Sequence, residues 1–326
     1  MPVTFKSAEA ARASLFDPPL ADKPSAKRLA NHRTVSATAI DGWSSALFGV
    51  PFATAGIFMA LVALNRIHPQ KHAPDWVIGI IAGMFFFGGV FFVVHGICGV
   101  IDNAAWRREA AVHPNQPWLY DYRWRREGIA FSAFDDMVKR LLAAIVWTTF
   151  LLPFAWVGLT QRGAWPFLAA VGIFGLLGLI FWYRWAQMLF DFLRYGNSFL
   201  TYNEFPFALG GVLRARLRVA NHVSAIDELI LTFRCVEEKY VTVNTGRDRE
   251  TRVVCYELYA ESATFDRDRL NGLLAGEIPV EFRIPPDQPG TTLVATPPTY
   301  WEIEAKGKAS GADYQAYFMV PVYKIS

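Results

Sequence analysis

Few residues in this 326-residue chain could do chemistry, and the first pair is His95 and Cys98, three positions apart. On a helix, that spacing places both side chains on one face, where they could begin a haem or metal site. Such a site needs further ligands, and the other three long apolar stretches contain no histidine or cysteine. We therefore expect His95 to be packed or hydrogen-bonded, and we predict no cofactor.

Two adjacent carboxylates, Asp135 and Asp136, form the second such arrangement, because paired carboxylates can act as general acid and base. They lie beside Lys139 and Arg140, which favours a solvated helix face instead. Sequence motifs for metal-dependent hydrolysis, thiol redox chemistry, a nucleophilic serine or a phosphate-binding loop do not occur. We therefore expect a protein without enzymatic activity.

An alternating segment, 117–126, combines aromatic and cationic side chains. Amphipathic aromatic rings suit a membrane interface, and Trp, Tyr and Arg are also favoured anchors of protein interfaces. The segment could equally be a loop packed on the helices or on the C-terminal domain, and the sequence leaves these interpretations open. The candidate interface residues are Trp118, Tyr120, Tyr122, Trp124 and Arg125.

A second candidate surface is a stripe of arginines that alternates with apolar residues over 213–219. Anionic lipids attract such basic segments, so the stripe could dock the C-terminal domain on lipid headgroups. A solvated strand face is the alternative. The stripe consists of Arg214, Arg216 and Arg218.

The elements that must position these residues begin with a membrane half. The chain is 53% hydrophobic, with a mean hydropathy of +0.21, and the excess lies in the first 190 residues. Four stretches approach the roughly 20 apolar residues needed to span a bilayer, and each must be helical because lipid cannot satisfy backbone polar groups. They are Trp43–Leu64, Val77–Val100, Leu141–Leu159 and Trp165–Tyr183.

The distribution of Lys and Arg predicts the orientation of these helices. Basic residues concentrate in the N-terminal tail and in the second loop, 101–140, which places both in the cytosol. The chain is therefore expected to lie in the bacterial inner membrane with its N-terminus and C-terminal domain cytosolic. The net charge is only +3, without a dense basic block, which argues against nucleic acid as a partner.

Glycines on two of these stretches predict close helix packing. Small residues let helix backbones approach one another in lipid. The contact could lie within a four-helix bundle or at an interface with a partner or a second copy, and both remain open. The candidate packing residues are Gly79, Gly83, Gly88, Gly172 and Gly175.

From about residue 195 the apolar period changes from helical to two, with turn signals between short runs. This pattern predicts an antiparallel β-sandwich over 195–326, after a tail at 1–40 and a transmembrane domain at 41–190. Within the second loop, near-helical spacing from Ile129 to Leu141 predicts an amphipathic lead-in helix. A hairpin around 244–249 could bring Cys235 near Cys255, and we expect free thiols in a reducing cytosol.

Two motifs carry a resemblance to known families. The stretch 194–217 (RYGNSFLTYNEFPFALGGVLRARL) and PWLYDYRW at 117–124 resemble uncharacterised bacterial multi-pass membrane proteins of the DUF3592-like type. The C-terminal end is similar to arrestin-like sandwich domains, which implies a protein-binding module without enzymatic activity. Only one such sandwich occurs, so a two-lobed arrestin mechanism is not implied. The matching residues are Trp301, Glu302, Ile303, Glu304, Ala305, Gly311, Asp313, Tyr314, Phe318, Val320, Pro321 and Val322.

These features predict a membrane-anchored scaffold or adaptor, with membrane lipids and other proteins as partners, and a homo-oligomer as a further alternative. The same features fit an accessory subunit of a respiratory, photosynthetic or secretion complex. A transporter or a cofactor-bearing membrane enzyme is the third alternative, and it would need polar groups clustered at one depth of the helices.

Overall fold

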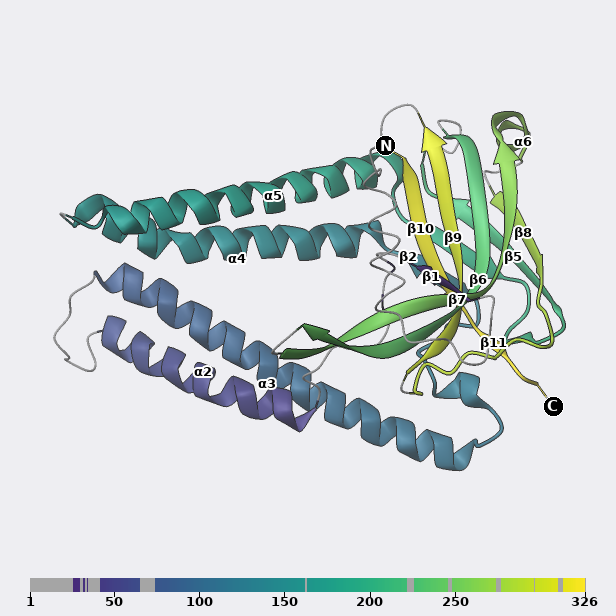
Figure 1. Cartoon of the computed structure of the whole chain (residues 1–326), viewed down its shortest axis with the longest axis horizontal. Coiled ribbons are helices and arrows are strands. Elements are labelled where there is room, and N and C mark those ends of the chain that lie inside the picture. The colour runs from purple at the N-terminus through teal and green to yellow at the C-terminus, as the bar shows by residue number, and fades with distance from the viewer. Residues whose placement is uncertain are drawn as a thin grey trace, which may run out of the picture.

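The computed structural model describes residues 26–29, 32, 34, 42–64, 74–161, 163–221, 226–245, 248–273, 277–295, 297–309 and 313–325. Most of the predicted tail, 1–40, lies outside these residues. The described part consists of long helices on one side and β-sheets on the other (Figure 1).

Four helices are long and apolar enough to cross a membrane, as predicted: α2 (Trp43–Ala63), α3 (Asp75–Val112), α4 (Ala133–Thr160) and α5 (Trp165–Tyr195). The 38 residues of α3 extend about 57 Å at 1.5 Å per residue. This length exceeds the roughly 30 Å of bilayer hydrocarbon, so α3 is longer than a single span requires.

The helices form two hairpins, α2 with α3 and α4 with α5, rather than one evenly packed bundle. The hairpins meet at the end far from the sheets, where the rings of Trp76 and Trp156 lie 6.0 Å apart. From there they diverge toward the sheets (Figure 1).

Two antiparallel sheets make up the other half of the molecule. The five-stranded sheet has the order β1 (Lys27–Leu29), β7 (Asp248–Asp266), β6 (Ile226–Thr245), β9 (Thr299–Ala309) and β10 (Tyr314–Val320). The four-stranded sheet has the order β2 (Gly128–Phe131), β3 (Ser198–Tyr202), β5 (Val212–Val219) and β8 (Glu277–Arg283). The smaller elements are the parallel pair β4 (Phe207–Ala208) and β11 (Val322–Tyr323), a 3-10 helix (Pro117–Leu119) and α6 (Arg267–Asn271).

The main core lies between the two sheets and follows the predicted alternation. Leu213 and Leu217 of β5 are fully buried, and they join Leu231 and Phe233 of β6 in one cluster. Trp301 of β9 stacks on Phe233 with ring centroids 4.7 Å apart. Large rings buried in this way contribute strongly to stability.

The sheets recruit strands from outside 195–326. Strand β1, from the tail, pairs with β7, and β2, from the second loop, pairs with β3. The lead-in helix was therefore predicted wrongly over Ile129–Phe131, and α4 begins only at Ala133. The reason is tertiary: Gly128, with φ 145°, leaves room for the β3 backbone, and pairing with β3 outweighs a local helical preference.

The expected proximity of Cys235 and Cys255 is wrong. In the β6–β7 hairpin, Cys235 pairs with Tyr259 and Cys255 pairs with Glu238, with a register shift after Cys235. The two thiols belong to separate buried clusters. None of the three cysteines, all within the described residues, forms a disulfide bond.

Candidate functional site

The hairpin α4/α5 continues directly into a pair of strands. Strand β2 ends at Phe131, Ser132 caps α4 by accepting a hydrogen bond from the Asp135 amide at 3.2 Å, and the helix begins at once. At the other helix, Gly196 with φ 66° and Asn197 connect α5 to β3. Because β2 pairs with β3, the ends of the two helices are fixed to the four-stranded sheet.

Three cavities surround this connection, with volumes of about 740, 510 and 380 Å³. The first and second share Arg140 and Asp191, and the second and third share Asp136 and Lys139. We call the three together the junction groove. It runs from the surface of α5, around the first turns of α4, to the segment 117–126.

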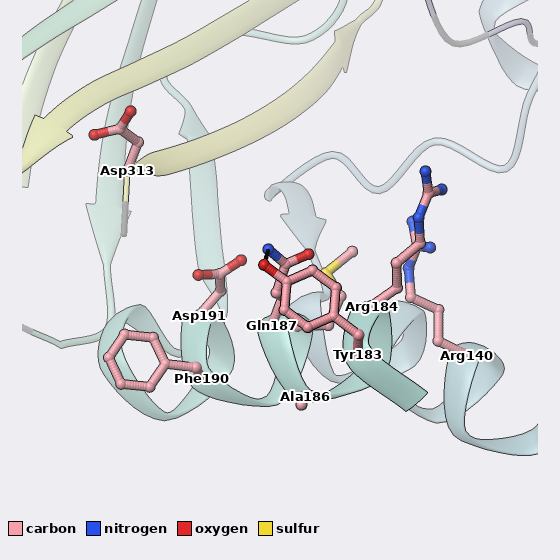
Figure 2. A pocket seen from close by; sticks show the side chains of 9 residues that line it. Arg140, Tyr183, Arg184, Ala186, Gln187, Phe190, Asp191 and Asp313 are labelled. Carbon is pink, nitrogen blue, oxygen red and sulfur yellow. Dashed lines mark hydrogen bonds between the residues drawn. The ribbon is translucent and has the colours of Figure 1, made fainter. Parts of the chain in front are cut away.

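The first cavity carries charges of both signs, separated in space. Arg140 and Arg184 direct their guanidinium groups to one end, and Asp191 and Asp313 lie toward the other end (Figure 2). Between them, the Tyr183 hydroxyl accepts a hydrogen bond from Gln187 Nε2 at 2.9 Å. Arg140 directly precedes one predicted span and Arg184 directly follows another, so both lie at a boundary of the apolar helix segments.

Strand β10 forms one wall of the second and third cavities. Alternate side chains of the strand, Gln315, Tyr317 and Met319, lie on that wall, and Tyr314 also lines the second cavity. The pKa of Tyr317 is raised, chiefly by burial and also by its contact with Glu304. Tyr317 therefore remains neutral near pH 7 and can both donate and accept hydrogen bonds.

The segment 117–126 packs on the sandwich, as one of its three predicted interpretations states. Trp124 Nε1 donates to the Tyr323 hydroxyl at 2.9 Å, and the ring of Trp118 lies 5.9 Å from that of Tyr323. Tyr120 instead contacts Trp106 of α3, with ring centroids 6.1 Å apart. Tyr122 is 38% exposed, and Arg125 is also exposed. Binding of a lipid or protein by these residues remains a prediction.

Asp121, which is not among the predicted interface residues, holds this segment in place. Its carboxylate accepts hydrogen bonds from the amides of Leu293 and Val294 at 3.0 and 2.9 Å, and from the Tyr323 hydroxyl at 3.1 Å. Burial and the nearby Asp121 charge raise the pKa of Tyr323, so this donor keeps its proton. Alternation within 117–126 gave no sign of these contacts, since the donors lie more than 170 positions away.

A buried charge cluster on the outer face of the five-stranded sheet was also missed. Arg234 of β6 donates to Glu302 at 2.6 Å and to Glu304 at 2.9 Å, and all three side chains are less than 10% exposed. Burial alone lowers the pKa of Arg234, but the surrounding carboxylates outweigh it and raise the pKa. From the tail, His32 Nε2 lies 3.1 Å from Glu302. The cluster therefore fixes β6 to β9 electrostatically.

The predicted helix-packing glycines do not contact a neighbouring helix of this chain. An added Cβ at Gly79, Gly88, Gly172 or Gly175 would meet no atom within 4 Å, and at Gly83 it would meet only Phe87 of the same helix. The close approach of α2 and α3 occurs instead at a different set, Gly49, Gly56, Gly89 and Gly96. Packing within the chain was thus assigned to the wrong face of α3, while contact with another molecule stays a prediction.

The arginine stripe lies on the outer face of the four-stranded sheet, where β8 supplies opposite charges. Arg214 lies 3.5 Å from Glu281, and Arg216 lies 3.4 Å from Glu277. The face is therefore of mixed charge rather than cationic, because the neighbour of β5 could not be known from β5 alone. Docking of the stripe on lipid headgroups remains a prediction.

His95 and Cys98 lie on an exposed part of α3, where the imidazole stacks on Phe91 with ring centroids 5.9 Å apart. Within the described part of the chain, no group of three His, Cys, Asp or Glu side chains is arranged to hold a metal ion. The Asp135 amide donates to Ser132, the cap of α4, and Asp136 pairs with Lys139 at 3.4 Å.

Comparison with known proteins adds only distant structural similarity. No protein-family model matches the chain, and no curated protein matches it. Among solved structures, a similar chain is the sporulation control protein Spo0M from Bacillus subtilis, at 11% identity and a TM-score of 0.25. The alignment covers 39% of this chain and 48% of Spo0M. A similarity this low carries no argument about fold or function, and the arrestin-like and DUF3592-like resemblances remain predictions.

Proposed function

We propose that this chain is a non-enzymatic integral membrane protein that holds an extended segment of a partner protein along β10, at the membrane surface. The observation that supports this scaffold function is the edge of β10 that no described strand pairs with, beside the junction groove and strand β2. Strand β10 pairs only with β9 and ends the five-stranded sheet of the described residues.

The polar backbone groups of β10 alternate between β9 and the open edge. The Met319 carbonyl accepts a hydrogen bond from the Tyr202 hydroxyl at 3.0 Å, so it points away from β9. By alternation, the N–H and C=O groups of Gln315 and Tyr317 point to the same side. Among the described residues, these groups have no backbone partner there. Such an edge can accept an extended peptide as an additional strand.

Rigid attachment to the helices supports the same function. The one-residue and two-residue connections at Ser132 and at Gly196–Asn197 fix β2 and β3 to the helices, and β10 contacts β2. A partner bound along β10 would therefore be held close to the bilayer. The basic tail and second loop support a bacterial inner-membrane protein with its sandwich on the cytosolic side. A reporter that is active on only one side of the membrane, fused to the C-terminus, would test this position.

Photocrosslinking from the full-length chain in its native membrane tests the binding function. A photoreactive amino acid placed at Tyr317 faces the groove. One placed at Glu281 of β8, an edge strand of the four-stranded sheet, is the control. We expect a product of one defined mass from position 317 and none from 281. Gln315→Pro, which removes the outward N–H, should abolish the product, whereas Gln315→Ala keeps that N–H and should preserve it. Equal products from both positions, or none from 317, would refute strand addition at β10.

A further inference from the structure

The first cavity of the junction groove presents a second binding chemistry, independent of a protein partner. Within the described residues, neither Arg140 nor Arg184 has an acidic group within 4.0 Å, although two carboxylates line the same cavity. Like charges placed together without a counterion favour an anion between them. Arginine is well suited to phosphate because its fork of donors can contact two oxygens at once.

The position of the two arginines indicates the source of such a phosphate. Arg140 is followed by the apolar run that starts at Leu141, and Arg184 follows the run that ends at Tyr183. They therefore lie where hydrocarbon ends and lipid phosphates begin. Arg184 and Asp191 are separated by seven residues of α5, or about 10 Å along the helix axis, so the carboxylate lies farther from the hydrocarbon.

The charges of the cavity lining match one headgroup class. Arg140 and Arg184 balance Asp191 and Asp313, and the carboxylates lie on the side farther from the apolar segments (Figure 2). An anionic headgroup would place additional negative charge near these two carboxylates. A zwitterionic headgroup instead places its phosphate near the hydrocarbon and its ammonium farther out. This order matches the cavity, where the arginines lie nearer the apolar segments and the carboxylates lie farther away.

We propose that the first cavity binds the headgroup of a phosphatidylethanolamine-type lipid, with its phosphate on Arg140 and Arg184 and its ammonium on Asp191 and Asp313. A volume of about 740 Å³ accommodates a small-molecule headgroup. The primary ammonium donates hydrogen bonds to carboxylates, whereas the quaternary ammonium of phosphatidylcholine has no N–H to donate. The site should therefore distinguish these two zwitterionic lipids.

Native mass spectrometry of the full-length chain, taken from vesicles with equal amounts of phosphatidylethanolamine, phosphatidylcholine and phosphatidylglycerol, tests the proposal. We expect preferential retention of phosphatidylethanolamine. Arg140→Gln or Arg184→Gln should weaken that retention by about threefold to tenfold, the effect of losing one charge-assisted hydrogen bond in a partly exposed site. Asp191→Asn with Asp313→Asn should remove the preference over phosphatidylcholine. Arg283→Gln, an exposed arginine of β8, is the matched control and should change nothing.

Several outcomes would overturn the assignment. Equal retention of all three lipids, a preference for phosphatidylglycerol, or the same loss in the Arg283→Gln control would exclude this site. Soluble phosphoethanolamine bound as tightly as the lipid would identify a free phosphate ester as the ligand instead. Arg184→Lys keeps the charge and should restore most of the binding, which separates loss of the phosphate contact from loss of folding.

Discussion

Replacing Arg234 with methionine removes a buried cation that lies between Glu302 and Glu304. The remaining carboxylates are 6% and 5% exposed, so solvent screens them little. Removing one partner of a buried ion pair costs about 3–5 kcal/mol where the other charge stays buried and uncompensated. Glu304 keeps Lys306 Nζ at 2.8 Å, so this cost applies chiefly to Glu302. We therefore expect Arg234→Met to lower the free energy of unfolding of the sandwich by about that amount.

Thiol labelling in a Cys98→Ser background measures this loss on the full chain in detergent. Cys235 and Cys255 are buried, so a maleimide reaches them only when the sandwich opens. A loss of 3–5 kcal/mol raises the labelling rate by roughly 10²-fold to 10³-fold or more, at 1.36 kcal/mol per factor of ten. The triple variant Arg234→Met, Glu302→Gln, Glu304→Gln should label more slowly than Arg234→Met alone. A change of less than threefold in Arg234→Met would refute the assignment of the cluster as a stabilising contact.

Three further predictions follow from the described contacts. Asp121→Ala leaves the Leu293 and Val294 amides without their acceptor, so we expect a loss of about 1–3 kcal/mol and faster proteolysis within 117–126, whereas Glu204→Ala, an exposed control, should show neither. Gly89→Leu places a side chain against the backbone at Ala53 and should separate α2 from α3 in disulfide-crosslinking experiments, whereas Gly79→Leu, in open space, should not. Burial raises the pKa of the Cys255 thiol to about 11, above the unfolded value of about 8.5. The stability that the protonated thiol contributes is therefore complete below pH 8.5 and is lost as the pH rises to 11. In Cys255→Ala, this part of the pH dependence should disappear from unfolding curves.

Local patterns were sufficient to predict the four apolar helices and the alternation of β5. Leu213 and Leu217 are buried where a period of two requires it, and each helix contains one predicted apolar run. These properties depend on neighbours within one segment, so periodicity alone specifies them. The same reasoning placed the packing glycines on the wrong face of α3, because the spacing of glycines does not reveal which neighbour each one contacts.

The remainder depended on contacts between distant segments. Strand β2 is paired because β3 lies beside it, which outweighs a local helical pattern over Ile129–Phe131. The charge of the arginine stripe depends on glutamates more than 60 positions away. The junction groove combines α4, α5 and β10, and their register is set by tertiary packing. A single sequence does not specify such pairings, so Arg234, Asp121 and the paired arginines of the cavity emerged only from the structure.

Hydrogen exchange at the edge of β10 examines the scaffold function at the atoms that would bind. In the purified chain, the outward amides of Gln315 and Tyr317 should exchange quickly, since no described backbone group accepts from them. In native membranes that contain the partner, both should be protected by at least tenfold, while Glu281 at the edge of β8 should be unchanged. Equal exchange of Gln315 and Tyr317 in the two preparations would contradict strand addition at this edge.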